Sequence, residues 1–291
     1  DRLIWERDGV SWPNRGASRF VAAAGFRWHV QILGSGPPLL LIHGTGASTH
    51  SFAELAPLLA EHFTVVAPDL PGHAFTDLPQ RKLLSLPGMA HSLAALLAVL
   101  GVQPQFCAGH SAGAAILIRM ALDGAIAPYG IVSINGALLP FGGIAGHLFS
   151  PLAKLIALNP LVPKLVARTA ASRSAVENLL LGTGSATPKV YVDVYEKLFR
   201  SPQHVAATLS MMACWDLDAF AGGLPKLQIP LTLIAAANDK AIPPKDADRA
   251  AQIVKSAHVE HIPRLGHLCH EEQPNLIAAL IHDAWNRSNK N

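Results

Sequence analysis

The sequence predicts an α/β fold in which a mostly parallel central sheet is flanked by helices and carries a helical cap. Two observations predict it. Short apolar runs typical of buried strands alternate with longer segments of helical spacing, as in parallel sheets covered on both faces. Residues 137–218 break this alternation with helical stretches, repeated prolines and no clear strand. We therefore expect one core, formed by residues 1–136 and 219–291, and one cap (lid) insertion, formed by residues 137–218.

The expected elements follow one another in a regular order. Strands are expected at residues 27–33, 38–42, 63–67, 105–110, 130–135, 230–237 and 257–262. Helices are expected at residues 51–61, 89–100, 112–122, 244–255 and 273–286. Because parallel strands end at the same edge of a sheet, residues just after them are expected to lie close together.

The segment Gly109-His110-Ser111-Ala112-Gly113 joins an expected strand to an expected helix. A nucleophile elbow requires this setting: the serine occupies a strained turn, and small neighbours let strand and helix approach closely. A glycine turn with a helix N-cap serine gives the same pattern without catalysis. The functional interpretation of Ser111 therefore depends on partners elsewhere in the chain.

Asp239 and His267, which lie later in the chain, are expected to complete a catalytic triad with Ser111. A serine hydroxyl needs a histidine base and an acid that orients the histidine. Asp239 follows one expected buried strand, and His267 lies on the loop after the next, so Ser111, Asp239 and His267 stand in the expected chain order. Considered separately, each residue has a simpler interpretation without catalysis: the aspartate as a turn residue and the histidine as a loop or capping residue. Asn135 occupies another place where the acid can stand, but an amide carries no negative charge.

Two backbone N–H groups are expected to form an oxyanion hole. Ala112, which follows the serine, supplies the first. The second is expected from the glycine-rich loop that begins at His43-Gly44, with Thr45 as the first choice and Gly46 as the alternative. These glycines would suit a tight turn as well, but their position upstream of the elbow favours the functional interpretation.

By these motifs the chain resembles the α/β-hydrolase superfamily over nearly its whole length. The motifs are His43-Gly44, Asp69-Leu-Pro-Gly-His73, the elbow at Ser111, Asn238-Asp239, and Gly266-His267 followed by Glu271, Glu272 and Pro274. Ala74 departs from the pattern, since relatives usually have a glycine there, and we expect a tighter or differently aimed loop. The resemblance implies an α/β-hydrolase fold and a serine hydrolase.

A narrower resemblance is carried by six further stretches. They are Trp12-Pro-Asn-Arg15, Ser18-Arg-Phe-Val21, Arg27-Trp-His-Val-Gln31, His43-Gly-Thr-Gly-Ala-Ser-Thr-His50, Ser133-Ile-Asn-Gly-Ala-Leu-Leu-Pro140 and Phe149-Ser-Pro-Leu-Ala-Lys154. They are similar to the magnesium-chelatase accessory proteins of bacteriochlorophyll biosynthesis. This implies a role in photosynthesis near magnesium insertion, with protoporphyrin IX or magnesium protoporphyrin as ligand and magnesium-chelatase subunits as partners. It implies no particular reaction.

Composition fits a globular enzyme. The 291 residues are 50% hydrophobic and 15% charged, yet no stretch reaches the roughly 18 apolar residues of a spanning helix. The charged first residues lack the apolar core of a signal peptide, so a cytoplasmic location is expected, with a peripheral position at the photosynthetic membrane as the alternative. Three cysteines without C-x-x-C spacing favour reduced thiols over a metal site, and no cofactor is expected. A net charge of +3 does not favour nucleic acid as a partner.

Substrate choice is expected to lie in the cap, because a triad does not select its acyl group. Residues 138–190 are rich in aliphatic side chains and carry five cations against one acid, Glu177. The cations are Lys154, Lys164, Arg168, Arg173 and Lys189. This suits a flat apolar ligand with carboxylates at its rim, such as a porphyrin, or an anionic membrane surface. Alternatively, the leucines only pack the cap and the cations are solvated. Met211 and Trp215 are expected to line the acyl pocket or to fill the core.

Two classes of function stay open. In the first the chain is a serine hydrolase, which includes a carboxylesterase or carbon–carbon bond hydrolase unrelated to tetrapyrroles. In the second it is a non-catalytic tetrapyrrole-binding or chelatase-docking protein. The complete triad favours the first class, and the narrower resemblance favours the second or both together. Haloalkane dehalogenases and epoxide hydrolases need an aspartate where Ser111 stands, which argues against them.

Overall fold

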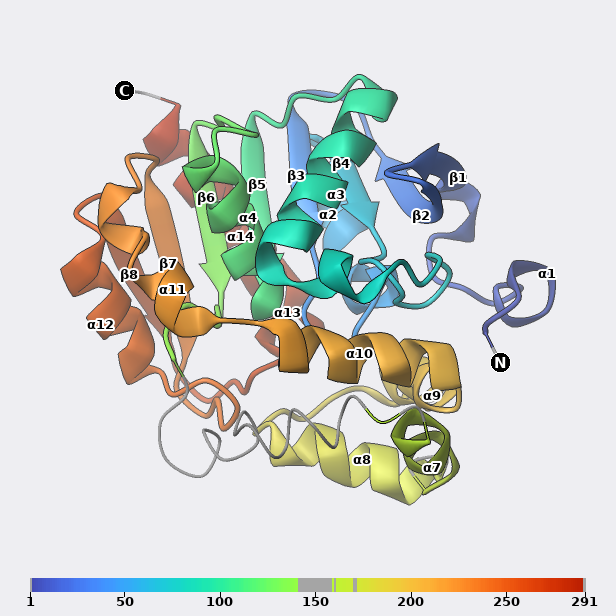
Figure 1. Ribbon diagram of the computed structural model, residues 1–291. Coiled ribbons are helices and arrows are strands. Elements are labelled where there is room, and N and C mark those ends of the chain that lie inside the picture. Colours follow the sequence, from blue (N-terminus) through green and yellow to red (C-terminus); the bar gives the residue numbers. More distant parts are fainter. Residues whose placement is uncertain (1, 141–158, 160, 170–171, 290–291) are drawn as a thin grey trace.

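A computed structural model describes residues 2–140, 159, 161–169 and 172–289 (Figure 1). In this part of the chain one sheet has the strand order β1-β2-β4-β3-β5-β6-β7-β8. The strands are β1 (Ser18–Ala23), β2 (Phe26–Leu33), β3 (Pro38–Ile42), β4 (Thr64–Pro68), β5 (Phe106–His110), β6 (Gly130–Ile134), β7 (Leu231–Ala236) and β8 (Ala257–Ile262). The pairs β1–β2 and β2–β4 are antiparallel and all others are parallel. The mostly parallel sheet predicted from the sequence is confirmed.

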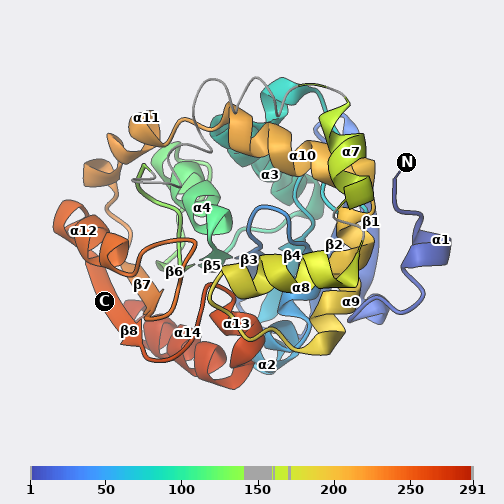
Figure 2. The same cartoon turned by 90° about the horizontal axis from the view of Figure 1, so that it is seen from below.

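Helices cover both faces of this sheet. The core helices are α1 (Trp5–Asp8), α2 (Leu55–Ala60), α3 (Leu86–Leu100), α4 (Ala112–Leu122), α12 (Lys245–Ile253), α13 (Cys269–Glu272) and α14 (Pro274–Ser288). Short 3₁₀ turns lie at η1 (Arg15–Ala17), η2 (Thr49–Phe52), η3 (Arg81–Leu84) and η4 (Leu224–Lys226). Figure 2 shows α3 and α4 on one side of the strands and α2 and α14 on the other. No described helix is both long and apolar enough to cross a membrane.

Strand β3 shows how the sheet divides the core. Leu40 and Ile42 pack into the cluster that contains α3 and α4, whereas Leu39 and Leu41 pack into the cluster that contains α2 and α14. The alternation follows from the two-residue period of a strand. With both faces covered, the central strands are buried along almost their whole length, which explains their uninterrupted apolar sequence.

Between β6 and β7 the described chain forms helices, of which the first four lie beyond the carboxyl ends of the strands and the last lies beside the sheet (Figure 1). They are α7 (Val162–Thr169), α8 (Arg173–Gly182), α9 (Lys189–Phe199), α10 (Pro202–Cys214) and α11 (Leu217–Ala221). We call α7 to α11 the cap helices. The limits of the cap at residues 137–218 stay a prediction.

Strand β1 was not expected from the sequence. It pairs with β2 through a two-residue turn in which Ala24 and Gly25 have φ angles of 54° and 84°. Two positive φ values define the hairpin turn that matches strand twist, but its usual sequence signal is Asn-Gly or Asp-Gly. Because alanine stands at the first position of the turn, the sequence lacks this signal. In addition, β1 lies at the sheet edge and is only partly buried.

Candidate active site

Ser111 occupies a strained turn between β5 and α4. Its φ and ψ angles are 50° and −115°, a region that non-glycine residues rarely adopt. The flanking glycines are required by packing. A Cβ on Gly109 would lie 2.5 Å from the backbone nitrogen of Ala114, and a Cβ on Gly113 would overlap the carbonyl of Ile42. The turn therefore projects the serine from the end of the central strand.

Asp239 and His267 form a hydrogen-bonded pair beside this turn. The Nδ1–H group of His267 donates to Oδ2 of Asp239 at 2.8 Å, and in the neutral imidazole this tautomer leaves Nε2 as the acceptor. The other carboxylate oxygen, Oδ1, accepts the backbone N–H groups of Ala241 and Ile242, each at 2.8 Å. These bonds fix the carboxylate. Ser111 and His267 line the same cavity, so the structure brings all three predicted residues together.

Asn135 holds the loop that carries His267. Its Nδ2 group donates to the carbonyl oxygens of Gly266 at 3.1 Å and His267 at 2.9 Å, while its Oδ1 accepts the N–H of Ala236 at 2.9 Å. The amide thus joins the ends of β6 and β7 to the histidine loop. Sequence analysis weighed Asn135 only as a missing acid, although an amide that both donates and accepts at a strand end was the available signal.

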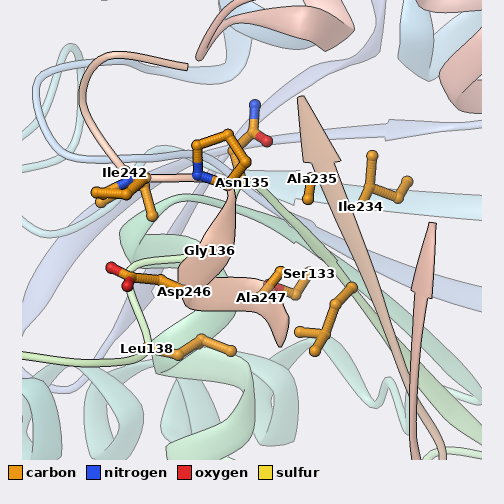
Figure 3. Close-up of a pocket in the computed structure, with 12 residues that line it drawn as sticks. Ser133, Asn135, Gly136, Leu138, Ile234, Ala235, Ile242, Asp246 and Ala247 are labelled. Carbon is orange, nitrogen blue, oxygen red and sulfur yellow. The ribbon is translucent and has the colours of Figure 1, made fainter. Parts of the chain in front are cut away.

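A small pocket beside Asn135 is not a substrate site. It lies between β6, β7 and the start of α12, near Ile242 and Asp246 (Figure 3). Its volume of about 10 Å³ is close to that needed for one water molecule.

A layer of buried polar groups lies next to His267. The rings of His110 and His270 stand 4.3 Å apart between their centres, and burial lowers the pKa of both, that of His270 to about 3. Glu271 accepts hydrogen bonds from Ser51 and, at 2.8 Å, from the hydroxyl of Tyr195 on α9. Burial raises the pKa of this carboxyl to about 8. At neutral pH the layer is therefore mostly uncharged.

The neighbourhood of Cys269 does not form a metal site. Among the described residues no group of three or more histidine, cysteine, aspartate and glutamate side chains is placed to hold an ion. Cys107 and Cys269 are buried, and burial raises the pKa of both thiols.

The glycine-rich loop after β3 faces the same cavity. Thr45, Gly46 and Ala112 all line it together with Ser111. His43 braces the loop: its Nδ1–H donates to the carbonyl of Gly44 at 2.8 Å, and its Nε2 accepts the N–H of Leu70 at 2.9 Å.

The cavity has a volume of about 470 Å³, within the range of small-molecule sites. Both Met211 and Trp215 line it, as do other apolar residues of the cap helices: Leu179, Leu180, Phe199, Met212 and Leu217. One of these residues, Leu179 on α8, is 54% exposed. Among its described lining residues Lys240 is the only lysine, arginine, aspartate or glutamate.

Sequence analysis did not single out Lys240, although it directly follows the predicted acid. The cations that were singled out lie elsewhere. Lys164 and Arg168 are exposed on α7 and do not line the cavity, and Lys154 lies outside the described residues. Composition indicated basic character in the cap but not the direction in which each side chain points.

Comparisons with known proteins agree with this architecture. The model of the alpha/beta hydrolase family matches residues 39–280. The chain belongs to the alpha/beta hydrolase family. This alpha/beta hydrolase is 38% identical over 276 residues to the magnesium-chelatase 30 kDa subunit of Rhodobacter capsulatus, covering 94% of this chain and 96% of the relative. It is 24% identical to the 2-hydroxy-6-oxo-2,4-heptadienoate hydrolase of Pseudomonas putida, covering 93% of this chain and 96% of that enzyme.

A solved structure shows the same fold. It is an alpha/beta hydrolase fold protein from Burkholderia ambifaria, with a TM-score of 0.78 and 23% identity over 92% of this chain and 97% of that one.

In this alpha/beta hydrolase the turn between α8 and α9 is anchored on the loops that carry Asp239 and His267. The carbonyl of Thr183 accepts the N–H groups of Lys240 at 3.0 Å and His267 at 3.3 Å. Ser185 Oγ accepts the N–H of Leu268 at 2.8 Å. A Cβ on Gly184 would overlap the backbone beside Asp239, at the carbonyl of residue 238. Sequence analysis missed this anchor, for which the closely spaced glycines at 182 and 184 were the available signal.

Ala74 occupies a position where the backbone favours glycine. Its φ angle is 43°, inside the left-handed region. Alanine thus takes a left-handed conformation here, and the tighter or differently aimed loop expected from the sequence stays a prediction.

Proposed function

We propose that the chain is a serine hydrolase in which Ser111 is the nucleophile, His267 the general base and Asp239 the residue that orients the base. The observation that carries this proposal is the 2.8 Å bond from His267 Nδ1–H to Asp239, beside a strained serine in the same cavity. The bond selects the tautomer whose Nε2 can accept a proton.

The reaction has two steps. Ser111 Oγ attacks the carbonyl carbon of an ester or related acyl group while its proton passes to His267 Nε2, and the N–H groups of Thr45 and Ala112 stabilise the oxyanion. The imidazolium then donates this proton to the leaving group. In the second step water, deprotonated by His267, releases the acyl group and restores the serine.

The cavity favours an apolar substrate that carries a negative charge. Its lining is apolar apart from a few polar groups, and Lys240 supplies a cation beside the catalytic loops. Tetrapyrroles such as protoporphyrin IX and magnesium protoporphyrin combine an apolar ring with carboxylates, so we propose them as ligands. The similarity to the Rhodobacter capsulatus subunit supports a role as magnesium-chelatase accessory protein in bacteriochlorophyll biosynthesis, and hence in photosynthesis.

The exposed cations of α7 suit contacts outside the cavity. Lys164 and Arg168 stand one helical turn apart, and Leu161 and Leu165 beside them are 69% and 62% exposed. A basic and apolar surface of this kind would fit either a chelatase subunit or the anionic surface of a membrane.

A second candidate is a tetrapyrrole-binding or chelatase-docking protein that does not use its triad. The 38% identical relative from Rhodobacter capsulatus is a magnesium-chelatase subunit by name, and that name describes no hydrolysis, which favours this candidate. A carboxylesterase or carbon–carbon bond hydrolase unrelated to tetrapyrroles is a third, supported by the hydrolase from Pseudomonas putida.

A fluorophosphonate probe separates these functions. The purified protein is treated with the probe, with and without magnesium protoporphyrin, and the adduct is located by mass spectrometry, with Ser111→Ala as the matched control. We expect stoichiometric labelling of Ser111 that the porphyrin blocks. Labelling that the porphyrin leaves unchanged would favour a hydrolase unrelated to tetrapyrroles. No labelling of folded protein would refute the hydrolase and favour the binding or docking role.

A further inference from the structure

One face of the cap helix α10 lies on the loop that carries Thr45. His204, Thr208 and Met211 are spaced by about one helical turn and therefore share this face. The Nε2–H of His204 donates to the carbonyl oxygen of Gly46 at 3.0 Å. The Thr208 methyl lies 3.5 Å from where a Cβ would stand on Gly46, and the hydroxyl of Thr45 donates to Met211 Sδ at 3.6 Å.

The same imidazole also binds the loop after β4. Nδ1 of His204 accepts the N–H of Ala74 at 3.1 Å. The two bonds require the neutral tautomer with its proton on Nε2, and burial supports it by lowering the pKa of His204 to about 4. One fully buried side chain thus joins a cap helix to two loops of the core.

Both loops need such a restraint. Gly46 has a φ angle of 76° and no side chain that would limit its rotation, and it directly follows Thr45. Ala74 holds a left-handed conformation that is unfavourable for alanine and persists only where neighbours enforce it. A bond to the carbonyl of Gly46 fixes the peptide group between Gly46 and Ala47, which limits rotation at Gly46 and thereby holds the end of the loop that carries the N–H groups of Thr45 and Gly46.

We propose that His204 is a positioning residue for the oxyanion hole: through its bond to the Gly46 carbonyl, the packing of α10 sets the geometry of the Thr45–Gly46 loop. His204 does not line the cavity and acts through the loop. The oxyanion role rests on the proposed hydrolase function, whereas the restraint on the loop does not.

Two conservative variants separate the two bonds of His204. In His204→Asn the amide oxygen replaces Nδ1 and still accepts from Ala74, but nothing donates to Gly46. In His204→Gln the amide nitrogen reaches the position of Nε2 and donates to Gly46, but nothing accepts from Ala74. His204→Phe keeps the ring and loses both bonds. His258→Gln, at an exposed histidine of β8, is the control for the substitution itself.

Steady-state hydrolysis of a short nitrophenyl ester and hydrogen–deuterium exchange are measured on each variant. We expect His204→Asn to lower kcat about 10-fold or more with KM within about twofold, since loss of an oxyanion donor itself costs about 100-fold or more. His204→Gln should recover most of this loss. Amide exchange should accelerate at residues 44–47 in the Asn variant and at residues 72–76 in the Gln variant.

Wild-type kcat in His204→Asn, or equal losses of kcat in the Asn and Gln variants, would overturn the positioning role while leaving the hydrolase intact. If the wild-type protein neither hydrolyses esters nor reacts with the fluorophosphonate, the proposed hydrolase function is refuted instead. In that case amide exchange at residues 44–47 still tests whether His204 restrains this loop, and unchanged exchange in His204→Asn would refute the restraint.

Discussion

Acidification from pH 7 to pH 5 is expected to destabilise the protein by several kcal/mol, because many histidines are buried in their neutral form. Burial lowers the pKa of His50, His73 and His110 well below the usual value and that of His204 and His270 to about 4 and 3. In the unfolded chain these histidines bind protons below pH about 6.5, whereas in the folded protein they do not.

The size of the effect follows from proton linkage. At pH 5 His204 and His270 each bind a proton on unfolding, which costs about 2 kcal/mol of stability per residue, and the other three histidines act in the same direction. Glu271 acts in the opposite direction: its carboxyl keeps its proton up to a pKa of about 8 when folded, so its contribution rises by about 3 kcal/mol as the pH falls to 5. The histidines together outweigh Glu271, and the expected net loss of several kcal/mol is a large part of the stability of a typical domain.

Urea unfolding followed by circular dichroism at pH 7, 6 and 5 measures this loss directly. In His270→Gln the difference between pH 7 and pH 5 should shrink by about 2 kcal/mol, since one titrating group is removed. A free energy of unfolding that stays constant within about 1 kcal/mol between pH 7 and pH 5 would refute the assignment of these histidines as neutral buried groups.

Three further substitutions test the site and the cap. Gly113→Ala should destabilise the protein by about 2 kcal/mol or more in urea unfolding, because the new Cβ overlaps a backbone carbonyl, whereas Gly16→Ala, with open space around it, should change stability by less than about 0.5 kcal/mol. Asn135→Asp places a carboxylate against the two carbonyls of the histidine loop and should lower kcat for ester hydrolysis about 10-fold or more; wild-type turnover would show that the loop does not depend on this amide. Replacing Lys164 and Arg168 together by Gln should weaken sedimentation with anionic vesicles, with short-ester hydrolysis unchanged; unaltered sedimentation would exclude α7 as a membrane contact surface.

The sheet was predictable because its central strands are buried on both faces. Continuous apolar runs ending in polar or glycine residues mark such strands, and each of the seven expected strands corresponds to an observed one. The edge strand β1 carries no such run. The helix expected at residues 51–61 is divided in the structure into η2 and α2. Ser48 caps the first of these turns by accepting the N–H of His50, a local bond that periodicity does not show.

The candidate site was predictable as far as it depends on strand ends. Residues that follow parallel strands meet at one edge, so Ser111, Asp239 and His267 could be placed together before any contact was known. Contacts between segments far apart in the chain could not be placed in this way. The bond from His204 to the loop of Gly46 joins residues 158 positions apart, and no local pattern encodes the direction of its imidazole.

The turn between α8 and α9 limits how the cap can change during evolution. Because Thr183 and Ser185 accept hydrogen bonds from the backbones of the loops that carry Asp239 and His267, this turn helps to hold the proposed triad in place. A cap transplanted from another hydrolase would have to reproduce those acceptors as well as a new pocket. Substrate range can therefore change through the residues of α8 and α10 that line the cavity, while the turn between α8 and α9 must change together with the loops of Asp239 and His267.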